Sequence, residues 1–262
     1  MPNDTKIPAS TNASALSNAA ILITLTLVTM LYAMTVTIAN VSLPQIKGAL
    51  SATTDEIALI ITFNIIATAV ATPMTGWLST RFGRRNTLIW AVIGFTASSF
   101  LCGTATSLEQ LVFYRFLQGA CGAPLPPLCQ AIVVDAYPKE KIGQANAIFG
   151  MGVVLGPILA PTLGGYLSET YSWRWVFYMM VPCGLASLIG VLIFIRSHVN
   201  DKKADLDWTG FISLAVAIAA FQFMLDRGER LDWLDNWQIS ACAIAAIAGL
   251  YIFITHSLTS DR

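Results

Sequence analysis

The sequence predicts an all-α membrane protein with about eight transmembrane helices, and three observations support this fold class. First, 55% of the 262 residues are hydrophobic and only 11% are charged, whereas a soluble domain carries about 25% charged residues. Second, the charges are confined to short segments that leave eight apolar intervals long enough to cross a bilayer. Third, no charged stripe of helical period runs through these intervals, as it would on the outer face of a soluble helix.

The spans follow one another with short polar connections. They are predicted at residues 19–43, 57–79, 87–106, 110–134, 142–165, 175–195, 208–225 and 237–258. Residues 1–18 are rich in Asn, Ser, Thr and Ala and are expected to form a short cytoplasmic tail. The longest internal polar segment supplies a cytoplasmic linker at 197–207, which separates a six-span unit at 19–196 from a two-span segment at 208–262. The first span is too long for a cleaved signal peptide, so we expect it in the mature protein.

Basic residues predict the orientation of the spans, because short cytoplasmic loops hold the excess of Lys and Arg. With the N-terminus inside, ten basic residues fall on the cytoplasmic side and four on the external side, while Arg115 lies within the fourth span. Both termini are therefore expected in the cytoplasm. The formal net charge is zero and no basic cluster is interleaved with aromatic residues, so nucleic-acid binding is not indicated.

The residues typical of enzymes and metal sites are not arranged for chemistry. His198 and His256 have no Cys, Asp or Glu at metal-ligand spacing, and the five cysteines lie within spans without a C-x-x-C pair. No phosphate-binding G-x-x-x-x-G-K-[ST] motif occurs either. We therefore expect no catalytic residues, no metal and no cofactor, and any energy for transport would come from an ion gradient.

The connection between spans 2 and 3 reads GWLSTRFGRRNTL, from Gly76 to Leu88. Glycines at 76 and 83 allow a tight two-helix turn, and the basic residues of the loop are Arg81, Arg84 and Arg85. The segment resembles the G-x-L-x-D-R-x-G-R-R/K signature of the major facilitator superfamily, in which it forms a cytoplasmic gate. A basic loop without a gating role is the alternative.

Span 5 contains GMGVVLGPILAPTLGGYL, from Gly150 to Leu167, whose small residues permit close helix packing and whose prolines bend a membrane helix. It resembles the antiporter motif of drug exporters in the same superfamily, with Ala160 in place of a glycine. The matching residues are Gly152, Gly156, Pro157, Pro161, Gly164 and Gly165. TIANVSLPQI at 37–46 and YSWRWVFYMMVP at 171–182 are similar to motifs of the fourteen-span EmrB/QacA-type branch.

This resemblance implies a six-helix N-terminal domain followed by two additional spans, with a second six-helix domain absent. It implies the N-terminal part of a secondary active transporter of a bacterial inner membrane, a proton-coupled exporter of hydrophobic drug-like molecules that works by alternating access. Because such transporters place the substrate between their two halves, a C-terminal half or a partner chain would be needed. The alternatives are an exporter of an anionic or zwitterionic metabolite and a truncated membrane subunit that does not transport.

Two acids of the family pattern are missing. The aspartate of span 1 is replaced by Thr35 and that of the loop signature by Thr80. All fifteen acidic residues map to loops or span ends, so no carboxylate is predicted at the middle of the membrane. The coupling acid would then lie in the other half or be a boundary residue such as Asp135. Asp135 would pair with Arg81 or Arg84, or would be a solvated helix end.

Span 4 carries an arginine in the segment FYRFLQGACGAPLPPLCQ, at 113–130. Arg115 lies about five residues, or roughly 7.5 Å, inside the span, where its side chain could extend to the surface. Arg115, Gly119, Gly122 and Pro126 share one narrow helix face, and Gln118 lies one turn away. The segment also resembles the family's span 4 motif, whose arginine is tied to proton transfer and the substrate path. We predict a transport path that includes Arg115, Gln118, Asn40 and Gly122.

Overall fold

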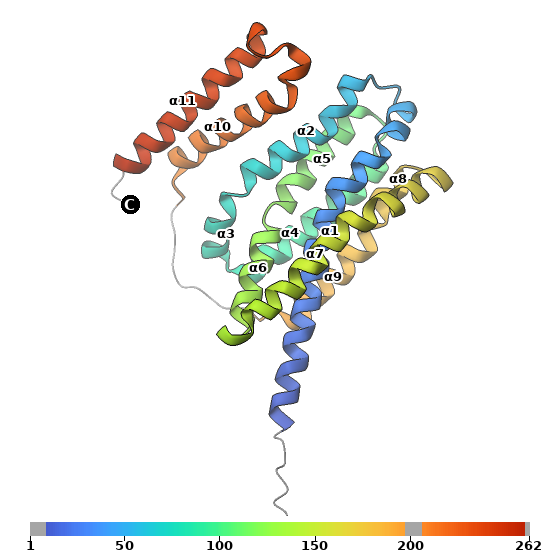
Figure 1. Cartoon of the computed structure of the whole chain (residues 1–262), viewed down its shortest axis with the longest axis vertical. Helices are drawn as coiled ribbons and strands as arrows, with labels where there is room; N and C mark the ends of the chain where they lie inside the picture. Colours follow the sequence, from blue (N-terminus) through green and yellow to red (C-terminus); the bar gives the residue numbers. More distant parts are fainter. Residues whose placement is uncertain (1–8, 197–205, 260–262) are drawn as a thin grey trace, which may run out of the picture.

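The computed structural model describes residues 9–196 and 206–259, which fold into a bundle of α-helices (Figure 1). Eight helical segments in this part of the chain are long and apolar enough to cross a membrane, as the sequence predicts. The helices are α1 (Ala9–Ala49), α2 (Thr54–Ala71), α3 (Met74–Phe82), α4 (Arg84–Thr104), α5 (Leu108–Gly122), α6 (Leu125–Ala136), α7 (Ile142–Thr170), α8 (Arg174–Tyr178), α9 (Met180–Phe194), α10 (Trp208–Arg227) and α11 (Trp237–Thr259). Short 3-10 turns lie at Lys139–Lys141, Glu229–Leu231 and Trp233–Asp235.

Three predicted spans are interrupted rather than continuous. The span at 57–79 breaks into α2 and α3 at Pro73, and the span at 110–134 breaks into α5 and α6 at Pro124. A proline lacks the N–H that a helix interior needs, and its ring clashes with the carbonyl four residues earlier. The predicted span at 57–79 therefore contains two helices rather than one. The span at 175–195 is likewise divided into α8 and α9 at Met179.

The two predicted polar segments only partly match the structure. Helix α1 begins at Ala9, so the expected tail at 1–18 is helical from residue 9 onward. Its first eight residues lie outside the described part of the chain, as do residues 197–205 of the predicted linker. At the end of the linker, Asp207 caps α10 by accepting a hydrogen bond from the backbone N–H of Gly210 at 3.0 Å.

The bundle has two ends, which we name by the chain. The tail end carries the start of α1 and the α3–α4 turn, and the far end carries the α1–α2 turn (Figure 1). At the tail end the Tyr137 hydroxyl donates to the carbonyl of Asn18 at 2.9 Å and ties the end of α6 to α1. Burial raises the pKa of the Tyr137 hydroxyl, which favours the protonated form that this bond requires.

The core of the bundle runs along α1. Helix α1 packs against α7 on one side and against α6 and α9 on others, while α2 and α4 pack on α5. The main hydrophobic cluster joins buried side chains from α1, α4, α6, α7 and α9, with Leu25, Leu88, Cys129 and Val191 among its most buried members. The buried Arg115 of α5 lies outside this cluster, between α2, α4 and α8.

The α10–α11 pair packs against the bundle through α2 (Figure 1). Asp226 of α10 accepts a hydrogen bond from the Thr62 hydroxyl of α2. Arg227 donates to the backbone carbonyl of Asp55 at 2.9 Å, and Arg230 forms an ion pair with the Asp55 carboxylate at 3.2 Å. These polar contacts fix the far end of the pair to the first half of α2.

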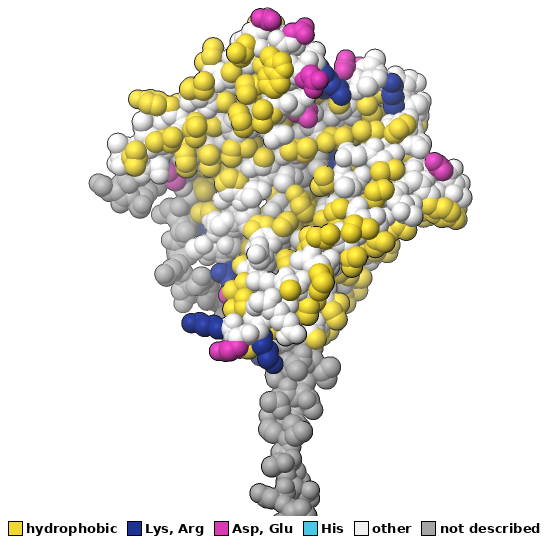
Figure 2. Space-filling view, viewed as in Figure 1, with side chains coloured by type: hydrophobic (Ala, Val, Ile, Leu, Met, Phe, Trp, Pro, Cys, Tyr) yellow, Lys and Arg dark blue, Asp and Glu magenta, His cyan; other side chains and the backbone are white. Residues whose placement is uncertain are grey.

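The molecular surface is that of an integral membrane protein. Large apolar side chains are exposed along α7, α10 and α11, including Ile158, Val216 and Ile247. Most of the acidic side chains visible in Figure 2 gather at the far end, and apolar side chains cover much of the surface between the two ends. The α7, α10 and α11 faces thus present hydrocarbon where a bilayer would lie.

Candidate functional site

Arg115 is the largest fully buried side chain in the described part of the protein. Only 1% of its surface is exposed, although it is an ionisable residue within a predicted membrane span. Its guanidinium therefore does not extend to the membrane surface, which was one of the two alternatives. It also does not line an open cavity in this conformation, because α2, α4 and α8 surround it.

The guanidinium is held by neutral groups. Arg115 Nη1 donates to Gln118 Oε1 at 2.6 Å, and Gln118 Nε2 donates to the Ser99 hydroxyl of α4 at 2.6 Å. The Ser99 hydroxyl in turn donates to the backbone carbonyl of Phe95 at 2.7 Å. The ring of Phe177, from α8, lies 5.8 Å from the guanidinium carbon and supplies a cation–π contact.

No carboxylate compensates this charge. The ion pairs among residues 9–196 and 206–259 involve other side chains, and Arg115 Nε has no hydrogen-bond partner. A buried cation is ordinarily paired or fully hydrogen-bonded, because its removal from water is costly. Arg115 is therefore a high-energy group in this conformation, with one donor free to bind an acceptor that enters the cluster.

Helix α2 fixes the backbone around this arginine. Asn64 Nδ2 donates to the carbonyl of Arg115 at 2.7 Å, and the Thr68 hydroxyl lies 3.2 Å from the carbonyl of Gly119. A Cβ atom at Gly119 would lie less than 3.0 Å from the carbonyl oxygen of Asn64. Glycine at 119 is thus required for α2 and α5 to approach closely enough for these bonds.

The remaining residues of the predicted path lie in different surroundings. Gly122 is buried on the same α5 face, where a Cβ would meet the rings of Tyr32 and Phe95. Asn40 is exposed on α1, and no hydrogen bond links it to the arginine cluster. The structure therefore joins Arg115 and Gln118 directly, with Gly122 one turn beyond them, and leaves Asn40 apart.

The α3–α4 turn is held by its arginines. Arg84 forms an ion pair with Asp135 of α6, which is one of the alternatives that the sequence left open for this acid. Arg85 donates to the carbonyl of Leu192 in α9 at 3.0 Å, and the guanidinium of Arg81 lies 5.9 Å from the ring of Trp77. The turn is thereby fastened to two other helices at the tail end.

The two glycines of this loop play different parts. Gly83 has a φ of 83°, which few side chains tolerate, and it lies between α3 and α4 as predicted for a tight turn. Gly76 lies inside α3, where a Cβ would meet nothing within 4 Å, so the expectation that it forms part of the turn is wrong. Thr80, which stands at the position of the missing acid, donates to the Gly76 carbonyl at 2.9 Å.

The other missing acid is also replaced by a satisfied hydroxyl. Thr35 is buried in α1 and donates to the carbonyl of Leu31 at 2.9 Å. Its hydroxyl is occupied within the helix and carries no charge.

Among the described residues, no three His, Cys, Asp or Glu side chains are placed to hold a metal ion.

The glycine-rich segment of α7 forms the interface with α1. Gly152 packs against Thr26, and Gly164 packs against Ile38. A Cβ at Gly156 would lie 2.7 Å from the carbonyl oxygen of Met30. A Cβ at Gly165 would lie 4.0 Å from the Val41 side chain, so this position is packed less tightly. Pro157 and Pro161 lie within α7 without ending the helix. The small residues therefore allow close helix approach, as the sequence suggested.

Sequence reasoning missed the partners of Arg115. Asn64, Ser99 and Phe177 come from three helices, and nothing in their local sequence marks them as neighbours of α5. The available signal was that two apolar spans carry polar residues, Asn64 in the second span and Ser99 in the third. Such residues in membrane helices usually face other helices.

Comparisons with known proteins agree with this arrangement. The family model described as Major Facilitator Superfamily matches residues 25–261. The Multidrug export protein EmrB of Escherichia coli (strain K12) is 36% identical over 241 residues, which are 92% of this chain and 47% of that protein. The Fatty acid resistance protein FarB of Neisseria gonorrhoeae is 38% identical over 223 residues, 85% of this chain and 44% of that protein. The chain thus spans about half the length of these relatives.

Solved structures share the fold. The peptide transporter POT in complex with sulfate has a TM-score of 0.68 at 16% identity, covering 94% of this chain and 53% of the other. The D-xylose–proton symporter has a TM-score of 0.61 at 16% identity, covering 91% and 67%. With the family model matching most of the chain and the EmrB protein similar along nearly all of it, this chain belongs to the major facilitator superfamily.

Proposed function

We propose that this chain forms half of a secondary active transporter that exports hydrophobic drug-like molecules in exchange for protons. The observation that carries the proposal is the buried, uncompensated Arg115 in a span of a major facilitator protein. An ionisable residue at such a position marks a transport or proton path. The relatives whose names concern multidrug export support the choice of substrate. The role is transport rather than catalysis.

In this proposal Arg115 acts from within the bundle. The cluster of Arg115, Gln118 and Ser99 is closed in the present conformation. Movement of α2 or α8 during alternating access would open it and let a carboxylate or a substrate group reach the free donor. Gln118 positions the guanidinium, while Gly122 and Asn40 would border the path once the helices move.

A complete transporter of this kind needs a second six-helix half. We propose that residues 19–196 form the first half, that 208–262 form an additional pair, and that the second half comes from a continuation of the chain or from a partner chain. Since Thr35 and Thr80 carry no charge, the titrating acid would come from that half. The gate at Arg81, Arg84, Arg85 and Asp135, with Gly76 and Gly83, would then act at the cytoplasmic side of a bacterial inner membrane, with both termini inside.

The test measures dye efflux from bacteria that lack their own exporters. Cells make this chain alone, or with a second six-helix half that continues after Arg262 or is co-expressed. We expect energy-dependent efflux of a hydrophobic dye only with both halves, and its loss in Arg115→Ala. Lys139→Ala, at an exposed position, is the matched control. Efflux by Arg115→Ala at the level of the unaltered protein would refute the assigned role.

A second candidate substrate class is an anionic amphiphile. The free donor of Arg115 and the absence of the acid at Thr35 favour a negatively charged group over a cationic one. The FarB relative is named for resistance to fatty acids, which are anionic amphiphiles. Efflux assays that compare a cationic, a neutral and an anionic dye of similar size distinguish the two classes.

A further inference from the structure

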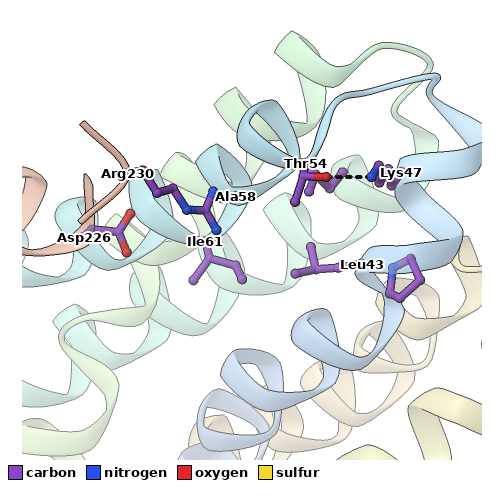
Figure 3. A pocket seen from close by; sticks show the side chains of 9 residues that line it. Leu43, Lys47, Thr54, Ala58, Ile61, Asp226 and Arg230 are labelled. Carbon is purple, nitrogen blue, oxygen red and sulfur yellow. Dashed lines mark hydrogen bonds between the residues drawn. The ribbon is translucent and has the colours of Figure 1, made fainter. Parts of the chain in front are cut away.

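A pocket lies at the far end, between the six-helix bundle and the additional pair (Figure 3). Its volume is about 450 Å³, which is within the range of pockets that hold small organic ligands. Helix α1 contributes Leu43 and Lys47, and α2 contributes Thr54 and Ile61. Asp226 and Arg230 close it from the side of the α10–α11 pair. The pocket is distinct from the Arg115 cluster, none of whose side chains lines it.

The polar side chains around this pocket are not equally occupied. Asp226 accepts a hydrogen bond from Thr62, and Arg230 is paired with Asp55. Lys47 differs, because its only described partner is the Thr54 hydroxyl at 2.6 Å. A lysine ammonium carries three donors. Two of them remain available for a negatively charged group, and no carboxylate forms an ion pair with Lys47 in the described part of the chain.

The wall below Lys47 is apolar and elongated. Leu43 of α1 faces Ile61 of α2 across the pocket, as the side chains in Figure 3 show. From Thr54 to Ile61, α2 advances about 10 Å at 1.5 Å per residue. The pocket thus has a cation near one rim and a hydrocarbon surface that continues along α2 from it.

We propose that this pocket binds a single-chain anionic amphiphile. Lys47 holds the carboxylate or phosphate group, and the chain lies along Leu43 and Ile61. A cationic head group fits this rim less well, because Lys47, which has no ion-pair partner among the described residues, would repel it. This binding does not require transport, so it stands apart from the proposed function.

The first experiment measures binding of a fluorescent fatty acid, dansyl-undecanoic acid, to the purified chain in phosphatidylcholine nanodiscs. We expect the acid to bind about tenfold more tightly than its methyl ester, since a charge-assisted hydrogen bond is replaced by a neutral one. Lys47→Gln should weaken binding of the acid about tenfold and leave the ester unchanged. Lys139→Gln, at the opposite end, is the matched control, and Lys47→Arg should restore binding.

The second experiment tests the apolar wall. Ile61→Trp should fill the space along α2 and abolish binding of the acid. Ile244→Trp, on the exposed face of α11, is the control and should bind normally. If the acid and the ester bind equally well to the unaltered protein, the proposal is wrong, whether or not the variants fold. Equal binding by Ile61→Trp and the unaltered chain would overturn it as well.

The source of the amphiphile is found by changing the nanodisc lipid. If lysophosphatidylglycerol displaces the probe, and native mass spectrometry finds that lipid retained by the unaltered protein but not by Lys47→Gln, a single-chain membrane lipid is the occupant. If lysophosphatidylglycerol does not compete while unlabelled fatty acid does, the occupant is a free fatty acid. Both results support the site. Probe that neither class displaces would contradict it.

Discussion

Arg115 and Arg84 carry the same guanidinium group in opposite settings. Arg84 lies at the tail end with 47% of its side chain exposed, and it pairs with Asp135, which is 61% exposed. Arg115 is 1% exposed and is bound by an amide oxygen and an aromatic ring. At the surface, water and a carboxylate stabilise the guanidinium charge. In the interior, only neutral groups stabilise it.

The difference separates stability from function. An exposed ion pair contributes about 0.2–1 kcal/mol, because water and salt screen it. A buried charge without a carboxylate opposes folding by several kcal/mol, and neutral hydrogen bonds offset only part of that cost. Arg115 therefore lowers the stability of this conformation, and under the proposed function its charge would act during transport.

The largest effect is expected where the buried arginine's helix meets α2. Gly119→Val should lower the free energy of unfolding by about 3 kcal/mol, because the new side chain would meet the rigid carbonyl of Asn64. Thermal unfolding of the purified protein in detergent measures this loss. Gly150→Val is the control, since its Cβ would meet nothing within 4 Å. Equal losses in both variants would contradict close α2–α5 packing.

The next largest effect concerns the acceptor of the buried charge. Gln118→Leu should destabilise the protein by about 2 kcal/mol, because Arg115 Nη1 loses its acceptor while remaining buried. Gln118→Glu should melt at or above the temperature of the unaltered protein, because it supplies a carboxylate to Arg115. If Gln118→Leu melts at the temperature of the unaltered protein, the guanidinium has another partner and the comparison with Arg84 fails.

Removal of the buried charge itself should have a smaller effect than removal of its acceptor. Arg115→Met keeps a long side chain without the charge, so we expect stability within about 1 kcal/mol of the unaltered protein, or above it. Dye efflux by the complete transporter should be lost in the same variant. A melting temperature that falls further than in Gln118→Leu would show that the arginine is needed mainly for folding.

The smallest effect is expected at the surface pair. Arg84→Ala and Asp135→Ala should each cost about 0.5 kcal/mol, and exchange of the two charges should recover most of the loss. A double-mutant cycle from melting curves measures the coupling, which should shrink as salt is added. Coupling above about 2 kcal/mol would mean that this pair behaves like a buried one.

Hydropathy predicts the number and order of the spans well, because a bilayer requires long apolar helices whatever their neighbours. Local sequence also predicts the α3–α4 turn, since Gly83 is one of few residues able to adopt its φ of 83°. The break at Pro73 was missed because the surrounding residues remain apolar across it. Proline interrupts the helix there because it lacks a backbone N–H and clashes with the preceding turn, and hydropathy measures neither effect.

The surroundings of Arg115 could be predicted only in part. The sequence places Arg115 and Gln118 on adjacent turns of one helix, and the structure joins them. It does not specify the rotation of α2 and α4 about their axes, which brings Asn64 and Ser99 to α5. The sequence places every acidic residue in a loop or at a span end, and it does not show that Asp226 reaches Thr62, about 12 Å along α2 from Thr54. Tertiary packing determines such contacts.

The glycines of α7 differ in how well they should tolerate substitution. Every other amino acid is larger than glycine, so each codon change that alters Gly152, Gly156 or Gly164 places an atom less than 3.0 Å from α1. The same changes at Gly143 or Gly150 meet open space. In a library that covers all substitutions, the tolerated and rejected glycines should therefore trace the line of contact between the two helices.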